Sequence, residues 1–280
     1  MSDFLMREDS PLSECEWAAI DDAVVASARQ NMVARRVLSI YGPLGAGLEA
    51  VHTNVFGNPT DGAVSYTGEA DNDPVEAKGR AVTPLMIVHK DFRIGWRELE
   101  LAHQLKLPID TSAASAAGVF AARAEDSLIF FGNKDSGITG LMNADGRNKL
   151  KLTDWSNPPA AVENLVSAVT LLREQGYSQP HAAILSPNLY SSLLKVREGG
   201  NSLELEFART ILSGGVFESP SLGANQGIVL ALGPQNFDLA VGQDLVASYL
   251  ETISMNHVLR VFETIALRIK RPGAICTLEK

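Results

Sequence analysis

One stretch of this sequence limits the folds open to the chain more than any other. Residues 51–83 are rich in Gly, Asn, Asp, Pro and Thr and hold few large apolar side chains. Loops longer than about 15 residues are uncommon inside compact domains unless they are functional or disordered. A two-stranded arm lying on a neighbouring subunit would receive its apolar cover from outside the chain. We therefore expect an extended arm and an assembly of several copies.

The composition excludes several classes of protein. No apolar run in the 280 residues approaches the roughly 20 residues that span a bilayer, and residues 1–10 lack the basic start and apolar stretch of a signal peptide. We expect a cytoplasmic protein with no membrane partner. The net charge of −9 opposes binding to a phosphate backbone, so no nucleic-acid partner is expected. Cys15 and Cys276 are too few for a disulfide scaffold or a four-cysteine zinc site.

The spacing of apolar residues near the start of the chain predicts an amphipathic helix over residues 13–38. Ser13 and Glu16 fit a capping box. Two apolar stripes at helical spacing run along it, and the second of them either packs within the subunit or receives another chain. The first stripe comprises Trp17, Ile20, Val24 and Ala28, and the second comprises Val25 and Met32.

Further helices and strands follow in mixed order. A strand is predicted over residues 85–96, and then a long helix that Asp110 caps and Gly132 ends. Its packing face is predicted to be a small-residue stripe of Ile109, Ala113, Ala116, Phe120 and Ala124. Short helices and strands continue to residue 215, and the runs at 227–232, 237–241 and 245–250 predict a meander of strands. Residues 258–270 are predicted to form the longest strand. The order indicates an α+β fold.

The sequence offers no recognisable catalytic or metal-binding motif. The glycines of residues 42–47 have the wrong spacing for a dinucleotide-binding loop and follow a helix, so we interpret them as a turn. No nucleophile motif and no phosphate-binding lysine loop is present. The histidines lack metal-ligand spacing and are interpreted as structural; they are His52, His89, His103, His181 and His257. We therefore expect neither an enzyme nor a metal protein.

A set of short motifs along nearly the whole chain resembles the family 1 encapsulins, and above all their iron-storing members. No single motif decides the resemblance, but many occur in the family's order. They are Asp3-Phe4-Leu5, Pro11-Leu12, Glu16-Trp17, Arg35-Arg36, Tyr41-Gly42-Pro43-Leu44-Gly45, Trp96-Arg97-Glu98, Glu125-Asp126, Ile129-Phe130-Phe131-Gly132, Gly140-Leu141-Met142 and Gln243-Asp244-Leu245.

The resemblance implies a shell protein with the tailed-bacteriophage major capsid fold of the Hong Kong 97 type. Such proteins assemble into an icosahedral homo-oligomer that encloses cargo enzymes, here ferritin-like iron-oxidising proteins for iron storage and protection from oxidative stress. The implied division has five parts: the N-terminal helix and start of the peripheral domain (1–47), the extended arm (48–86), the peripheral domain (87–132), the axial domain (133–233) and the C-terminal strands of the peripheral domain (234–280).

The resemblance also implies three sets of site residues. Cargo proteins of the family dock a C-terminal peptide on the inner wall, and the matching residues are Ala28, Met32, Arg35, Val37, Leu245 and Ala247. The loop that lines the pore at a symmetry axis matches Arg197, Glu198, Gly199, Gly200, Asn201 and Ser202. Some relatives hold a flavin against a tryptophan that matches Trp96, although the usual companion residues are not evident here and a structural role for this side chain is the alternative.

Two other functions stay open from the sequence. A prophage major capsid protein would share the fold, but phage relatives normally begin with a long scaffolding segment, whereas here the first helix starts near Ser13. A flavin-binding shell with peroxidase cargo is the other alternative. An enzyme in its own right lacks a nucleophile with a base.

Overall fold

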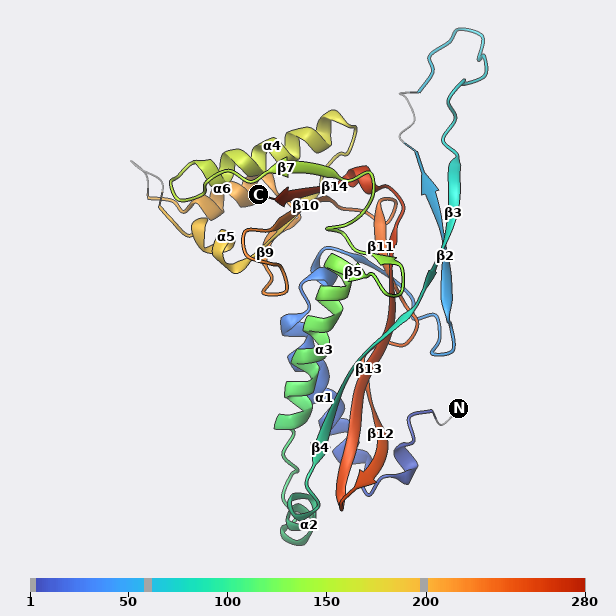
Figure 1. Ribbon diagram of the computed structural model, residues 1–280, viewed down its shortest axis with the longest axis vertical. Helices are drawn as coiled ribbons and strands as arrows, with labels where there is room; N and C mark the ends of the chain where they lie inside the picture. The colour runs from blue at the N-terminus through green and yellow to red at the C-terminus, as the bar shows by residue number, and fades with distance from the viewer. Residues whose placement is uncertain (1–3, 58–61, 197–200, 280) are drawn as a thin grey trace.

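The computed structural model describes residues 4–57, 62–196 and 201–279. Two sheets with their helices form two bodies, and a two-stranded arm projects beyond them (Figure 1). Helix α1 (Glu14–Asn31) lies along α3 (Ser112–Phe131) in the lower body. No helix in these described ranges is long and apolar enough to cross a membrane.

Helix α1 begins as predicted and ends earlier. The Ser13 N–H and hydroxyl both donate to Glu16 Oε2 at 2.7 Å, which confirms the capping box. The first predicted apolar stripe is buried, and so is Met32 of the second, whereas Val25 is half-buried. The helix stops at Asn31 because the Asp126 carboxylate accepts the N–H groups of Val33 and Ala34 at 2.9–3.1 Å in place of helical carbonyls. A short 3-10 turn, η2 (Ala34–Arg36), follows. The predicted helix to residue 38 is therefore too long by two turns.

The predicted packing face of α3 is wrong. Residues Ala113, Ala116, Phe120 and Ala124 are exposed, and the buried face lies one position further along, through Ala114, Ala117, Gly118, Ala121 and Ala122. Gly118 explains the choice: a Cβ there would lie 2.5 Å from Ser27 Oγ and 2.7 Å from the Val24 carbonyl oxygen of α1. An alanine-rich helix carries two such small faces, and only the one with the glycine admits the close approach of α1.

The lower sheet has the order β1–β11–β13–β12, with β4 also paired to β13. Its long central strand is β13 (Asn256–Ile269), which pairs antiparallel with β4 (Met86–Ile94), β11 (Phe237–Val241) and β12 (Val246–Ile253), while β1 (Ser39–Tyr41) runs parallel to β11. Helices α1 and α3 pack on this sheet. A short helix, α2 (Trp96–Leu105), follows β4 and was not predicted.

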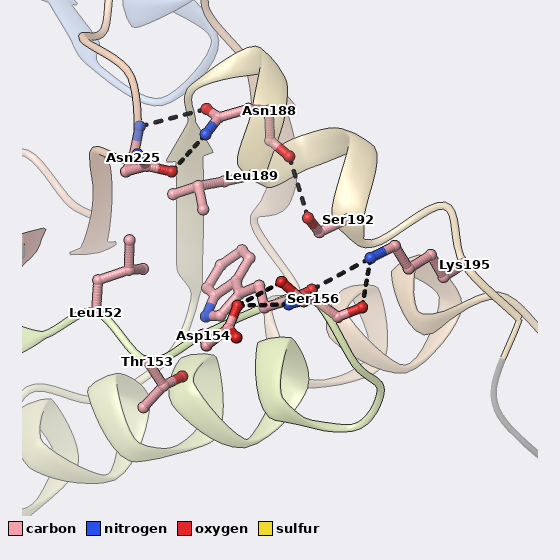
Figure 2. Close-up of a pocket in the computed structure, with 10 residues that line it drawn as sticks. Leu152, Thr153, Asp154, Ser156, Asn188, Leu189, Ser192, Lys195 and Asn225 are labelled. Atoms are coloured by element: carbon pink, nitrogen blue, oxygen red, sulfur yellow. Dashed lines mark hydrogen bonds between the residues drawn. The ribbon is translucent and has the colours of Figure 1, made fainter.

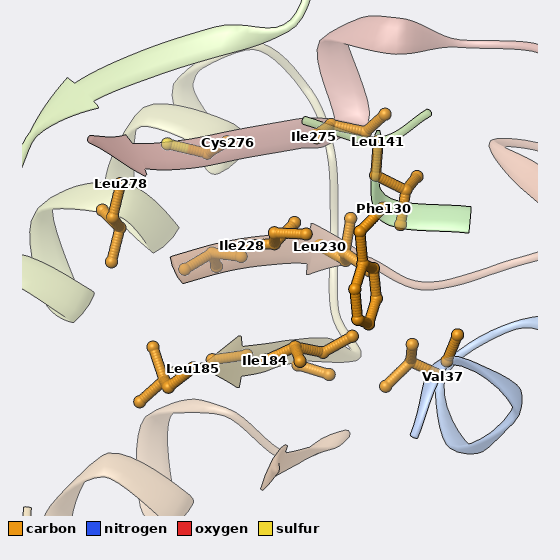
Figure 3. Close-up of a cluster of buried hydrophobic side chains, with 14 of the residues drawn as sticks. Val37, Phe130, Leu141, Ile184, Leu185, Ile228, Leu230, Ile275, Cys276 and Leu278 are labelled. Carbon is orange, nitrogen blue, oxygen red and sulfur yellow. The ribbon is translucent and has the colours of Figure 1, made fainter. Parts of the chain in front are cut away.

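The upper sheet has the order β7–β14–β10–β8–β9. Its strands are β7 (Asn148–Lys151), β8 (His181–Leu185), β9 (Gly215–Glu218), β10 (Gly227–Ala231) and β14 (Ile275–Glu279), with α4 (Ala160–Glu174), α5 (Pro187–Ser192) and α6 (Glu204–Ile211) beside them. Ile184, Ile228, Ile275 and Leu278 form its core, which Phe130 and Val37 extend toward the lower body (Figure 3).

The pairing corrects the predicted strand meander. Strand β10 belongs to the upper sheet, and β11 and β12 are separated by β13 in the lower one. The final strand, β14, inserts between β7 and β10 through residues 275–279. The chain returns to the upper body after the 3-10 turn η3 (Pro272–Ala274), and the division into peripheral and axial domains stays a prediction.

The predicted two-stranded arm is present. Strand β2 (Ala50–Phe56) pairs antiparallel with β3 (Ala77–Pro84), and the two form a sheet of their own within the described ranges. At the base of the arm, Val51 packs with Ala240 and Ala266 of the lower sheet. Four large side chains of the arm are at least 60% exposed to solvent: Val64, Tyr66, Val75 and Val82. Shorter elements complete the chain: η1 (Arg7–Asp9), β5 (Gly132–Asn133) and β6 (Ile138–Thr139).

Candidate functional site

The end of α1, the middle of α3 and the strands β12 and β13 meet at one charged cluster. Arg35, which follows α1, donates to Glu125 of α3 at 2.9 and 3.0 Å, to Asp244 before β12 at 2.8 Å, and to Glu263 of β13. Both Glu125 and Glu263 are fully buried, and the Arg35 side chain is 18% exposed. With Asp126 these residues form what we call the carboxylate cluster.

Burial raises the pKa of two acids in this cluster. It raises the pKa of Asp126 to about 7 against the opposing hydrogen bonds from Ala34 and Val33. It also raises the pKa of Glu263, and the neighbouring Glu125 adds to that shift. Asp244 is partly exposed, and the hydrogen bond and charge of Arg35 outweigh burial and lower its pKa. The single guanidinium thus faces several carboxyl groups, and burial favours the protonated form of Asp126 and of Glu263.

Arg35 was expected as a site residue, whereas Glu125 and Asp244 were recognised only within family motifs and Glu263 was not singled out. Glu263 lies among the apolar residues of β13, between Val261 and Ile265, and Glu125 and Asp126 lie on the buried face of α3. Acidic residues in such apolar positions are almost never buried without a partner. Acidic residues in these apolar positions could therefore have predicted a buried ion pair from the sequence. They do not identify which cation is the partner.

The six expected cargo-site residues lie in one region but in different clusters. Ala28, Met32 and Ala122 form a small apolar cluster against which Leu245 packs. Ala247 is buried in the neighbouring cluster between α1 and β12, and Val37 is buried in the core that continues into the upper sheet. Leu245 alone among the five apolar positions is partly exposed, and it touches two of these clusters.

The N-terminal segment covers the edge of β12 beside these residues. The Tyr249 N–H donates to the Leu5 carbonyl at 2.9 Å, and the Arg7 guanidinium donates to the Ala247 carbonyl at 2.7 and 3.1 Å and to Asp21 at 2.8 Å. Arg7 also stacks on Trp17 with its guanidinium carbon 4.5 Å from the ring centroid. The chain's own first residues therefore lie against the strand that carries Ala247.

Trp96 begins α2 at the surface and is 37% exposed. The backbone N–H of Trp96 donates to the side-chain oxygen of Asn256 at 3.3 Å, and the Arg97 guanidinium lies 5.4 Å from the Trp96 ring centroid. It does not line the cavities of about 510, 430, 410 and 390 Å³ that other described residues form. One exposed aromatic face beside one cation does not enclose a flavin, so flavin binding at Trp96 stays a prediction without a built site in the single chain.

The expected pore loop lies only partly within the described residues. Arg197, Glu198, Gly199 and Gly200 lie outside them, whereas Asn201 is exposed and Ser202 is half-buried. The flanking residues Val196 and Leu203 form an antiparallel bridge. The role of the loop stays a prediction.

A cavity of about 510 Å³ lies in the upper body between α5 and the segment after β7 (Figure 2). Its polar groups bond to one another: Lys195 Nζ donates to the Ser156 carbonyl at 2.7 Å, Asn188 donates to Asn225, and Asp154 accepts from Ser156. Groups of three or more metal-ligating side chains do not occur in the described parts of the chain.

Comparison with solved structures defines the class of protein. The virus-like particle of Pyrococcus furiosus superimposes with a TM-score of 0.75 at 23% identity over 95% of this chain and 99% of that one. The capsid of the myovirus XM1 does so with a TM-score of 0.61 at 11% identity over 88% and 90%. The chain therefore has the tailed-phage capsid fold of the Hong Kong 97 type, as the sequence predicted.

Sequence comparison then gives the family. The model of Linocin_M18, described as encapsulating protein for peroxidase, matches residues 1–266. The type 1 encapsulin shell protein EncA of Myxococcus xanthus is 43% identical over 100% of this chain and 97% of its own length. A diheme-cytochrome–encapsulin fusion of Kuenenia stuttgartiensis is 37% identical over 94% and 72%, and a ferritin-like–encapsulin fusion of Pyrococcus furiosus is 30% identical over 74% and 56%. The chain belongs to the Linocin_M18 family of encapsulin shell proteins, and its role is structural rather than catalytic.

Proposed function

We propose that this chain assembles with copies of itself into a closed icosahedral shell that encloses cargo proteins. The observation that carries the proposal is the arm: among the residues that the structure describes, β2 and β3 pair only with each other, and the arm leaves Val64, Tyr66, Val75 and Val82 in solvent. Exposed apolar side chains on an extended arm favour cover by another copy. The match to encapsulin shell proteins over the whole chain supports the same conclusion.

Ferritin-like iron-oxidising enzymes are the proposed cargo, and storage of iron with protection from oxidative stress is the proposed role. The supports are the full-length match to EncA and the ferritin-like fusion relative. A peroxidase is the second candidate cargo, because the family description names one. A prophage capsid protein is a weaker alternative that rests on the fold shared with XM1.

Cargo peptides are proposed to dock where Leu245 packs on Ala28 and Met32. This is the point at which the apolar wall between α1 and β12 is partly open. Arg35 and Asp244 lie beside it and pair with each other, so they offer a peptide polar contacts at the rim of the apolar surface.

Co-expression tests the cargo proposal. A ferritin-like protein with a C-terminal tail rich in Leu, Gly and Ser is expressed with this chain, and the same protein without its tail is the control. We expect shells that retain only the tailed protein and that mineralise added ferrous iron. Loading of both forms alike would remove the docking mechanism, and retention of a tailed peroxidase in preference to the ferritin-like protein would favour the second cargo.

A further inference from the structure

An edge strand lies beside the proposed cargo wall, and the chain covers it with a segment of its own. Strand β12 ends the path β1–β11–β13–β12, and among the described strands it pairs with β13 on one side. An edge strand presents N–H and C=O groups with which another extended chain can pair. On β12 these groups belong to Ala247 and Tyr249, and residues 4–9, which we call the cover segment, lie against them.

Three separate groups bind this edge in place of a neighbouring strand. The Leu5 carbonyl accepts the Tyr249 N–H at 2.9 Å. The Arg7 guanidinium donates to the Ala247 carbonyl at 2.7 and 3.1 Å. The Asp21 carboxylate of α1 accepts the Ala247 N–H at 3.4 Å and binds Arg7 at 2.8 Å. The cover segment thus supplies one backbone acceptor and one side-chain donor where a paired strand supplies a regular ladder.

Little burial holds the cover segment in place. Phe4 is 45% exposed and Met6 is 44% exposed, and the 3-10 turn η1 buries no residue. Met6 has a φ of 50°, in the left-handed region that is unfavourable for residues other than glycine. Phe4 contacts Phe262 edge to face, with 6.2 Å between the ring centroids. A segment with little buried surface and a strained residue opens at low cost, so another chain can replace it.

Release of the cover segment leaves the start of α1 intact. The Ser10 hydroxyl accepts the indole N–H of Trp17 at 3.0 Å. Leu12 is buried with Trp17 in one core cluster, and the capping box of α1 begins at Ser13. These contacts anchor the chain directly behind the cover segment, so residues 4–9 can leave β12 by rotation about Ser10.

We propose that the outer edge of β12 is a further part of the cargo site, and that a cargo peptide adds to it as a strand after displacing the cover segment. Leu245, where the wall is partly open, lies two residues before Ala247, so in an extended backbone the two side chains share a face. A peptide that packs on Leu245 and continues along β12 pairs with the Ala247 carbonyl and the Tyr249 N–H. This inference rests on the cargo docking proposed above and adds its mode: the cover segment competes with cargo.

Cargo retention by variants of the cover segment tests the competition. The tailed ferritin-like protein is co-expressed with the full chain at graded levels, and the fraction that co-purifies with shells gives an apparent affinity. Arg7→Gln removes a charge-assisted hydrogen bond of the cover, so the apparent affinity should rise by up to about tenfold. Phe4→Ala removes the aromatic contact and should raise it about threefold. Arg93→Gln, at an exposed position of β4, is the matched control and leaves it unchanged.

The direction of the change separates displacement from permanent cover. A cover segment that stays on β12 and supports the wall predicts equal or lower retention in both variants, and that result would overturn the proposal. Electron microscopy of the variants identifies any assembly defect; if Arg7→Gln does not assemble, the Phe4→Ala result decides alone.

Electron microscopy of loaded parent shells gives an independent readout. We expect the density of residues 4–9 to leave β12 and the density of an extended peptide to take its place. Loaded shells that keep the cover segment on β12 would contradict displacement while leaving the cargo docking itself in place. If the parent retains the tailed protein no better than the same protein without its tail, the cargo docking fails, and this inference fails with it.

Discussion

The guanidinium of Arg35 lies 2.9 Å from the carboxylate of Glu125, ninety residues further along the chain. This pair joins the end of α1 to the middle of α3, and the same guanidinium reaches Glu263 on the central strand of the lower sheet. One side chain therefore links three elements that form the wall proposed for cargo. The three motifs Arg35-Arg36, Glu125-Asp126 and Gln243-Asp244-Leu245, which carry part of the family resemblance, meet here.

Loss of this guanidinium is expected to destabilise the subunit strongly. Arg35→Met leaves Glu125 and Glu263 buried without a cation, and removing one partner of a buried ion pair costs about 3–5 kcal/mol. The midpoint of denaturant unfolding, measured at fixed protein concentration, should fall accordingly. Arg36→Met is the control, because Arg36 is exposed, donates to the Gln30 carbonyl at 3.2 Å and lies 5.8 Å from the Phe217 ring centroid, with no carboxylate partner among the described residues. Equal midpoints for the two variants would show that the cluster contributes little to stability.

The same cluster predicts how stability depends on pH. The pKa of Asp126 is about 7 in the folded chain against 3.8 for an ordinary aspartate, so between about pH 4 and pH 7 the folded state binds more protons than the unfolded state. The free energy of unfolding should therefore fall as pH rises through that window, by about 1.4 kcal/mol for each pKa unit of the shift. Glu263 acts in the same direction.

Denaturant unfolding between pH 4 and pH 8 measures this slope. Asp126→Asn should flatten it, because an amide oxygen still accepts the Val33 and Ala34 N–H groups but does not titrate. Asp22→Asn, at an exposed position of α1, should leave the slope as it is. A slope that Asp126→Asn does not change would place the titrating groups elsewhere.

The local signals in the sequence predicted elements well and their partners poorly. The capping box at Ser13 and the stripe from Trp17 to Ala28 identified the start and the buried face of α1, because both depend on residues within a few turns. The end of α1 depends on Asp126, which lies more than ninety residues away. The face of α3 depends on the fit of Gly118 against α1. Neither long-range contact is visible in the helical spacing.

The same limit applies to the strands and the site. The runs of the last third predicted strands, but the pattern holds no information on which sheet each one joins, so β10 was not placed in the upper sheet. Strand β14 was not predicted. For the site, the resemblance supplied Ala28, Met32 and Leu245, which the structure brings together. The resemblance identified Arg35 as a site residue but not its partner Glu263. Only the pairing of β13 with neighbouring strands brings Glu263 to Arg35.

Leu245 tests the proposed cargo wall. Leu245→Asp places a charge beneath a bound apolar peptide, which should weaken docking by roughly 2–5 kcal/mol, while shells still form. Mass photometry and gel analysis of purified shells then show empty particles. Leu250→Asp, on the exposed side of the same strand β12, is the control and should load cargo normally. Full loading of Leu245→Asp shells would mean that the wall is assigned to the wrong residues.

Glu198 tests the proposed pore, which rests on the sequence alone. Repeated around a symmetry axis, this carboxylate concentrates negative potential and attracts small cations such as ferrous iron. Glu198→Gln should slow the initial rate of iron uptake by cargo-loaded shells at low salt, and the difference should shrink at high salt. If Glu198 only pairs with Arg197, the initial rates at low salt will be equal, and only a size filter will remain.

The arm is proposed to need another copy of the chain to cover its apolar side chains. Size-exclusion chromatography of the purified protein at micromolar concentration, with electron microscopy of the eluted fraction, tests it directly. We predict that the protein elutes as a large assembly and that the images show closed shells of uniform diameter, because the arm buries its apolar side chains only against a neighbour. A stable monomer of 30.0 kDa would contradict the account.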